Sequence, residues 1–255
     1  MKKYIEELHS KKIFCLENIT PITGNQENAK ALLKNYKKQN LIVQIRRNLY
    51  SVTDLATKAT VANKFEIGSH ISDSACISYH SAFEYHGIAH QLFFTLYISS
   101  QTRFNNFEFE DMQYLYCKYN ISEGIEIPPM NSLIRVTNVE RTVIDCLDRI
   151  DRAGGLEELI HCLSMINYLD EKKLIIYLNL YNKAFLFKKA GFILKSFQTN
   201  MKLSDEFISL CRQNGARHVK YLTDPTESDT FHKDWNIYAP KNILSYLEQG
   251  NNELI

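Results

Sequence analysis

Several features are scarce or missing in this chain of 255 residues. It holds nine glycines, five prolines and one tryptophan, and it has no Gly-rich phosphate-binding loop. Its most apolar stretches, 91–98 and 174–187, fall short of the roughly 20 apolar residues that a membrane span needs. The first residues show no apolar core of a signal peptide. We therefore expect a cytoplasmic protein without a membrane-spanning segment.

The six cysteines are widely spaced and include no Cys-x-x-Cys pair. This pattern favours free thiols in a reducing compartment over disulfides or a zinc site. No internal repeat or low-complexity tract is present. Hydrophobic residues make up 45% of the chain and charged residues 23%, which excludes a disordered chain and is typical of a globular protein.

The charge is distributed unevenly along the chain. Residues 1–55 hold ten Lys and Arg against five acids, a net charge of +5, although the whole chain has a net charge of +1. A basic first segment on a slightly acidic remainder favours a polyanion-binding module joined to another domain.

Residues 1–53 have the pattern of a winged helix-turn-helix. Apolar periodicity predicts short helices over 2–10 and 17–22 and a longer amphipathic helix over 25–39, capped by Thr23 or Asn25. Strands are predicted at 41–45 and 49–52, around a turn in which Asn48 suits the left-handed conformation. This order of helices and hairpin is typical of DNA-binding modules.

The longest of these helices is the candidate recognition helix. Amide side chains at its start would face base edges in the major groove, and its lysines would meet phosphates. Arginines at the hairpin tip would reach the backbone or the minor groove. Exposed lysines are also common without any ligand, so the hypothesis depends on their coincidence with the helix order. The predicted DNA-binding residues are Asn25, Gln26, Asn28, Lys30, Lys34, Lys37, Arg46, Arg47, Asn48 and Tyr50.

The predicted fold class is α+β, with the winged helix-turn-helix over 1–53, a connection over 54–68 and a larger mixed α/β domain over 69–255. The predicted helices of the larger domain are 80–86, 137–150, 156–167, 170–181, 183–197, 204–214 and a last one from Lys241; the predicted strands are 77–79, 93–99, 113–119, 133–136, 218–222 and 235–238.

Three segments carry a resemblance to a known family. They are the hairpin 41–50, the segment Ile77-Ser-Tyr-His-Ser-Ala-Phe-Glu-Tyr-His-Gly-Ile88, and Val136-Thr-Asn-Val-Glu-Arg-Thr-Val-Ile-Asp145 followed by Gly154-Gly155. In this order they resemble AbiEi-type antitoxins and transcriptional regulators of bacterial type IV (abortive infection) toxin–antitoxin systems. Asn48 stands where the family usually has glycine. The motif residues, with a structural or antitoxin role, are Ser78, Ser81, His86, Gly87, Glu140, Arg141, Thr142 and Asp145.

The resemblance implies a repressor and antitoxin in one chain, acting in phage defence. From the residues themselves we expect no enzymatic activity, cofactor or metal. Its first module would bind inverted repeats in double-stranded DNA of its own promoter, where two copies would bind cooperatively. The remainder would counteract a nucleotidyltransferase-like toxin without forming a stable complex with it.

Other patterns leave alternatives open. His86 and His90 have the spacing of two metal ligands, and Asp145, Asp148 and Asp151 mimic a nuclease cluster, so a nuclease-like enzyme with a winged-helix targeting domain is the alternative function. A protein-interaction module is a third. Local pairing explains the acids more simply: Thr137-x-x-Glu140 has capping-box spacing, and Arg141 pairs with Asp145 on a helix surface. A second basic surface is conceivable at Lys188, Lys189, Lys195, Arg212, Arg217 and Lys220, although a solvated face is favoured.

Overall fold

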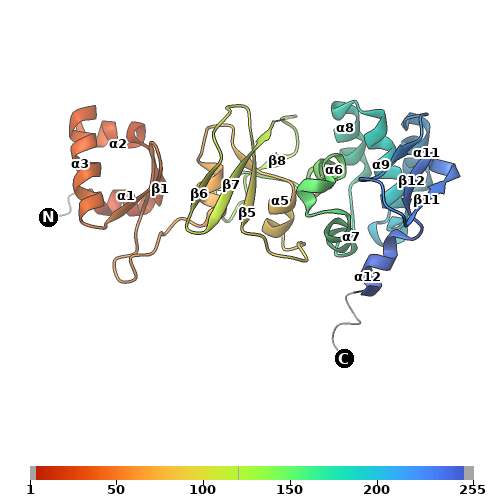
Figure 1. Cartoon of the computed structure of the whole chain (residues 1–255). Helices are drawn as coiled ribbons and strands as arrows, with labels where there is room; N and C mark the ends of the chain where they lie inside the picture. Colours follow the sequence, from red (N-terminus) through yellow and green to blue (C-terminus); the bar gives the residue numbers. More distant parts are fainter. Residues whose placement is uncertain (1–3, 120, 250–255) are drawn as a thin grey trace. The chain divides into compact units, whose positions relative to one another are not determined.

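The computed structural model describes residues 4–119 and 121–249 (Figure 1). These residues form two compact units: the first holds the described residues up to 77 together with 94–118 and 127–135, and the second holds the rest. Helices and several sheets are mixed along the chain, as the α+β prediction expected. In this part of the chain, no helix is long and apolar enough to cross a membrane.

The first unit begins with three helices and a small antiparallel sheet ordered β1-β3-β2. A cluster of buried residues that includes Leu8, Ile19, Leu33 and Leu41 joins the helices to the sheet. The elements are α1 (Ile5–Lys11), β1 (Ile13–Phe14), α2 (Leu16–Thr23), α3 (Gln26–Lys38), β2 (Ile42–Arg46) and β3 (Leu49–Val52). The predicted start of the first helix, at residues 2 and 3, lies outside the described residues.

A side-chain hydrogen bond sets the start of helix α3. The Asn25 side chain accepts from the Asn28 N–H at 2.8 Å, so Asn25 is the N-cap, whereas Thr23 ends α2. Ala29 and Tyr36 on the apolar stripe are buried, as the periodicity predicts. Asn48 has a φ of 61° between β2 and β3, the left-handed conformation expected for the turn.

The first unit continues with α4 (Lys64–Ser69) and four strands in the order β6-β7-β5-β4. The strands are β4 (Cys76–Ile77), β5 (Thr95–Ser100), β6 (Phe107–Phe109) and β7 (Met112–Lys118), and only β5 and β7 of these pair in parallel. Helix α4 lies in the stretch predicted as a connection, 54–68. Asn63 and Glu66 form its capping box, and Glu66 is fully buried. Only the first part of the predicted connection is therefore irregular.

The second unit is mainly helical and also holds two small sets of strands. Strands β8 and β9 form an antiparallel pair, and a separate sheet is ordered β10-β12-β11. The helices are α5 (His80–Tyr85), α6 (Val139–Asp148), α7 (Leu156–Ser164), α8 (Glu171–Tyr181), α9 (Ala184–Lys195), α10 (Gln198–Met201), α11 (Asp205–Asn214) and α12 (Tyr246–Gln249); the strands are β8 (Ile125–Glu126), β9 (Val136–Thr137), β10 (Lys220–Tyr221), β11 (Asp229–His232) and β12 (Ile237–Pro240). Short 3-10 turns follow α6 and flank β12.

Local signals explain several boundaries in the second unit. Ser204 is the side-chain N-cap of α11, where the sequence predicts the helix to start, and Asp170, the predicted first residue of the helix 170–181, is instead the N-cap of α8. Gly154 has a φ of 89°, and a Cβ there would lie 2.7 Å from the Phe93 ring. The Gly154-Gly155 pair thus allows the close turn between α6 and α7.

Candidate functional site

An open groove lies between α3 and the β2–β3 hairpin in the first unit. Four cations and one carboxylate line it, which leaves the groove with an excess of positive charge. Seven of the ten predicted DNA-binding residues are among its lining residues. The lining residues are Leu16, Glu17, Gln26, Lys30, Leu33, Lys34, Lys37, Gln44, Arg47, Asn48 and Tyr50.

Two contacts join polar side chains that line the groove. Lys37 Nζ donates to Gln44 Oε1 at 2.7 Å and so links α3 to β2. Lys30 Nζ lies 3.5 Å from Gln26 Oε1 on the same helix. Lys34 and Arg47 are exposed. The groove thus offers both fixed amide groups and solvent-facing cations.

Asn48 fastens the tip of the hairpin to the start of α2. Its Oδ1 accepts from the Leu16 N–H at 3.0 Å, and its Nδ2 donates to the two Glu17 carboxylate oxygens at 2.9 and 3.2 Å. These hydrogen bonds from Asn48 contribute most to lowering the pKa of Glu17. Asn48 therefore makes side-chain hydrogen bonds at this turn that a glycine could not make. Sequence reasoning missed Glu17, because its partner is 31 residues away.

Three predicted DNA-binding residues do not line the groove. Asn25 Oδ1 holds the start of α3, and Asn28 Nδ2 donates to the Thr23 carbonyl at 3.2 Å. Arg46 instead packs against aromatic rings, with Cζ 5.6 Å from the Phe104 centroid and 5.1 Å from that of Phe107. Its Nη1 is buried and has no hydrogen-bond partner among the described residues, and burial lowers the pKa of the guanidinium. Arg47 is therefore the exposed arginine of the hairpin tip.

In the second unit the family-motif residues are mostly buried. Ser78 and Ser81 at the start of α5 are fully buried. His86 ends α5, and its Nε2 donates to the Thr137 carbonyl at 2.7 Å. Gly87 follows with a φ of 71°. These residues join the end of α5 to β9 within one packed scaffold.

The start of α6 differs from the prediction. Asn138 rather than Thr137 is the N-cap, and its side chain accepts from the Arg141 N–H. Thr142 Oγ1 bonds the Thr137 hydroxyl at 2.8 Å. Glu140 has a tertiary partner, because its Oε1 accepts from the Asp170 N–H at 3.1 Å. The capping-box prediction was therefore wrong: sequence spacing identified the helix start but not its cap.

Arg141 and Asp145 do pair, but not on a helix surface. Their side chains are 2% and 1% exposed, and Arg141 Nε lies 2.6 Å from Asp145 Oδ1. Arg141 Nη1 also donates to the carbonyls of Ile121 and Glu123, and the Tyr181 hydroxyl donates to Asp145. Burial raises the pKa of Asp145, against the attraction of Arg141. Arg141 and Asp145 therefore form a buried ion pair within the fold, because tertiary packing covers this face of α6.

Asp148 and Asp151, the other two acids of the alternative nuclease-like cluster, have separate partners. Asp148 lies 2.7 Å from Lys183 Nζ, and Asp151 lies 2.7 Å from Arg149 Nη2. Asp145, Asp148 and Asp151 are not among the described groups that are close enough to share a metal ion. Each carboxylate is instead neutralised by its own cation.

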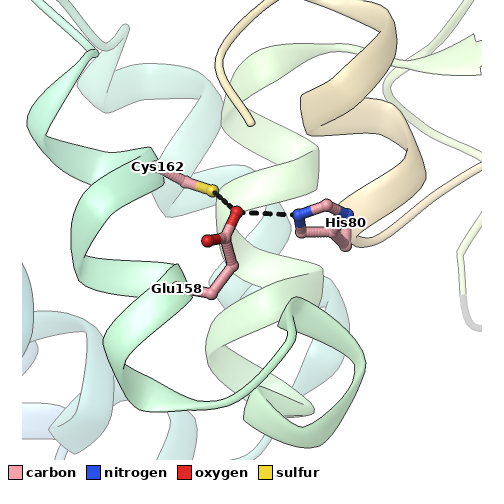
Figure 2. Close-up of side chains that lie close together, drawn as sticks. All are labelled: His80, Glu158 and Cys162. Atoms are coloured by element: carbon pink, nitrogen blue, oxygen red, sulfur yellow. Dashed lines mark hydrogen bonds and ion pairs between the residues drawn. The ribbon is translucent and has the colours of Figure 1, made fainter. Parts of the chain in front are cut away.

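His80, Glu158 and Cys162 meet in the interior of the second unit (Figure 2). Glu158 Oε1 lies 2.9 Å from His80 Nε2 and 3.3 Å from Cys162 Sγ. The same oxygen accepts from the N–H groups of His90 and Gln91 at 3.0 and 2.9 Å. Burial by itself would raise the pKa of Glu158, but the hydrogen bonds from His80 and Gln91 more than offset it and lower the pKa to about 2. Glu158 is thus a buried carboxylate held in its charged form.

Sequence reasoning found only part of this cluster. It paired His90 with His86, whereas His90 Nδ1 lies 3.3 Å from Glu158 Oε2 and its ring stacks on His161 at 4.0 Å. The available signal was the spacing of Glu158 and Cys162, four residues apart and so on one face of a helix. The spacing of Glu158 and Cys162 indicates a cluster only once the fold is known, because α5 brings His80 to the same face.

The six basic residues considered as a second basic surface, for which a solvated face is the favoured interpretation, do not all lie at the surface. Lys188 is buried, and its Nζ donates to the carbonyls of His218 and Asn236 at 2.8 and 3.0 Å. Lys189 Nζ donates to the Asp148 carbonyl at 3.2 Å. The remaining members, Lys195, Arg212, Arg217 and Lys220, are exposed. Lys188 therefore contributes to packing and not to a surface, because its side chain is buried and two backbone carbonyls hold its ammonium group.

Comparison with known proteins gives a fold but no family. No family model matches the chain, and no curated protein matches it. A solved structure with a similar fold is that of the RV2827C protein from Mycobacterium tuberculosis, with a TM-score of 0.67 and 9% identity. The match covers 97% of this chain and 93% of that one. The two chains therefore share an architecture over nearly their whole length.

Proposed function

We propose that residues 1–53 form a winged helix-turn-helix that binds double-stranded DNA, and that the chain is a cytoplasmic, non-enzymatic repressor and antitoxin like those of the AbiEi type. The order of elements supports the first half of the proposal. A short helix, α2, precedes the longer α3, and the β2–β3 hairpin follows directly. In such modules the second helix of the pair enters the major groove and the hairpin lies beside it on the backbone.

The groove between α3 and the hairpin is the observation that carries this proposal. Lys30, Lys34 and Lys37 line it from the helix, and Arg47 lines it from the hairpin. Cations on two sides of one concave surface match a duplex, which presents phosphates on both sides of a groove. Gln26 at the start of α3 has an amide that suits an adenine edge.

A pair of lysines on the same helix tests the groove. Lys34 lines it, whereas Lys38 is also exposed and does not. Each change to alanine removes one charge, so long-range attraction falls equally. We expect Lys34→Ala to weaken binding to DNA from upstream of the gene and to flatten the salt dependence by about one phosphate contact. Lys38→Ala should leave the salt slope nearly unchanged.

Fluorescence anisotropy at two or more salt concentrations measures both effects, with an unrelated duplex as the control for preference. Gln26→Ala should instead reduce the preference for the upstream DNA, by about 1–3 kcal/mol at particular base pairs. Equal behaviour of the Lys34 and Lys38 variants would contradict the groove assignment. Equal binding of both duplexes would contradict autoregulation, and binding insensitive to salt would favour a protein partner.

The antitoxin half of the proposal rests on the resemblance of the segments 77–88 and 136–155. Its partner would be a nucleotidyltransferase-like toxin, opposed without a stable complex, and two copies of the chain would bind an inverted repeat cooperatively. Co-expression with a nucleotidyltransferase-like toxin tests it, with growth as the readout. Lys34→Ala should still rescue growth while it relieves repression, because the two activities are assigned to different segments. Failure of the wild-type chain to rescue growth would contradict the antitoxin role and leave the repressor role standing.

A further inference from the structure

We propose that His80, Glu158 and Cys162 form a binding site for a single zinc-type divalent metal ion. The three ligand atoms all lie within 4.8 Å of one another, and all three residues are buried (Figure 2). His80 begins α5, whereas Glu158 and Cys162 lie one turn apart on α7. Imidazole, carboxylate and thiolate are the ligands that zinc takes in proteins.

The distances suit a tetrahedral ion after small side-chain shifts. Metal–ligand bonds of about 2.0–2.3 Å place neighbouring ligand atoms roughly 3.3–3.8 Å apart. The imidazole nitrogen and the thiol sulfur now lie 2.9 and 3.3 Å from the same Glu158 oxygen. An ion entering between them would replace these two hydrogen bonds with three metal–ligand bonds.

The charges also balance. A carboxylate and a thiolate neutralise a divalent ion, and a neutral imidazole completes the set, so the buried assembly would carry no net charge. On binding, the Cys162 thiol gives its proton to solvent, and the His80 ring changes tautomer by exchange with solvent, so that Nδ1 carries the ring proton and the Nε2 lone pair binds the ion. The other cysteines buried in helices, such as Cys211, have no His and Glu side chains grouped with them as ligands among the described residues.

Neighbouring groups supply an outer shell, and the fourth position of a tetrahedral ion would be left to a water molecule. His90 Nδ1 lies 3.3 Å from the second oxygen of Glu158, and its side chain is 47% exposed, which gives a route from solvent. The N–H groups of His90 and Gln91 already orient the carboxylate. Such outer contacts to ligating groups are typical of metal sites in proteins. The ion would tie α5, α7 and the segment around His90 together.

Cobalt(II) is the probe, because it gives a thiolate charge-transfer band and visible bands that report tetrahedral coordination. The experiment uses the full-length chain with Cys15→Ser, which removes the one half-exposed cysteine of the described residues. After treatment with a chelator, Co²⁺ and then Zn²⁺ are titrated. We expect one equivalent to bind with both signals, zinc to displace cobalt, and the melting temperature to rise with zinc.

Cys162→Ser should abolish the charge-transfer band and weaken zinc binding at least tenfold, whereas Cys211→Ser, a change at another buried helical cysteine, should leave both unchanged. His90→Gln should weaken binding less than Cys162→Ser. Binding without the thiolate band, no stoichiometric binding, or an unchanged band in Cys162→Ser would each overturn the proposal. If Cys162→Ser does not fold, the spectrum of the parent chain decides, together with Glu158→Gln. The outcome is independent of DNA binding.

Discussion

Arg47 and Arg141 have the same side chain in opposite surroundings. Arg47 lies exposed in the groove of the first unit, whereas Arg141 is buried in the second unit against Asp145 and two backbone carbonyls. Charged residues in the groove are therefore available to a ligand, whereas Arg141 and Asp145 of the later motif pair with each other. A recognisable motif in this chain can mark a buried scaffold as readily as a binding surface.

The physical reason is the cost of desolvation. A guanidinium at the surface keeps its water until a phosphate replaces it, so it favours binding and adds little to stability. A buried guanidinium must be paired and hydrogen-bonded within the fold. The comparison predicts that changes in the groove alter function and that changes at the buried motif alter folding.

The largest expected effect is at Arg141. Arg141→Ala leaves the Asp145 carboxylate buried without its cation, and such a loss costs about 3–5 kcal/mol of unfolding free energy. Arg47→Ala should change the unfolding free energy by less than about 0.5 kcal/mol and should weaken DNA binding instead. Urea unfolding measures the first quantity and anisotropy the second.

The double variant Arg141→Met with Asp145→Leu sharpens this prediction. Removing both charges leaves no uncompensated ion, so the double variant should be more stable than Arg141→Ala. If Arg141→Ala and Arg47→Ala lost a similarly small amount of stability, the prediction would be wrong, since burial would then make no difference to what each arginine contributes to stability.

Substitutions of Asn48 should have an intermediate effect on stability. Asn48→Gly keeps the left-handed turn but loses the hydrogen bonds to Leu16 and Glu17, at about 0.5–1.5 kcal/mol. Asn48→Ala loses the same bonds and also strains the turn, which adds about 1–2 kcal/mol. Thermal unfolding measures the order. Equal stability of the two variants would show that the turn itself contributes nothing.

The smallest effect concerns Glu66, a buried acid within the first unit. Burial opposes its ionisation, but hydrogen bonds from Asn131, the Asn63 N–H and Lys12 more than offset this and lower the pKa below 4.5. A lowered pKa contributes stability above the ordinary value, and this contribution is lost as the pH falls through the lowered one. Glu66→Gln should therefore lose less stability than wild type on acidification below pH 4.5. Urea unfolding at neutral and acidic pH tests it, and parallel curves would contradict it.

Elements with signals close in sequence were predictable. The start of α3 follows from Asn25, the starts of α8 and α11 follow from Asp170 and Ser204, and the hairpin turn follows from Asn48. Elements that depend on distant partners were not. Strand β1 is two residues long and exists because it pairs with β3. Helix α4 lies in a polar stretch, and the hydrogen bonds to its buried Glu66 come from Lys12 and Asn131, which are distant in sequence.

The candidate sites divide in the same way. Local periodicity placed the lysines of α3 off its apolar stripe, but only the fold decided that Lys30, Lys34 and Lys37 line the groove and Lys38 does not. The fold also separated Arg47 from Arg46, by packing Arg46 against Phe104 and Phe107. Likewise, helical spacing already places Glu158 and Cys162 on one face of α7, whereas His80 reaches them only through the packing of α5 in the folded unit. Capping and helical spacing act over a few residues, whereas burial depends on which distant segments exclude water from a side chain.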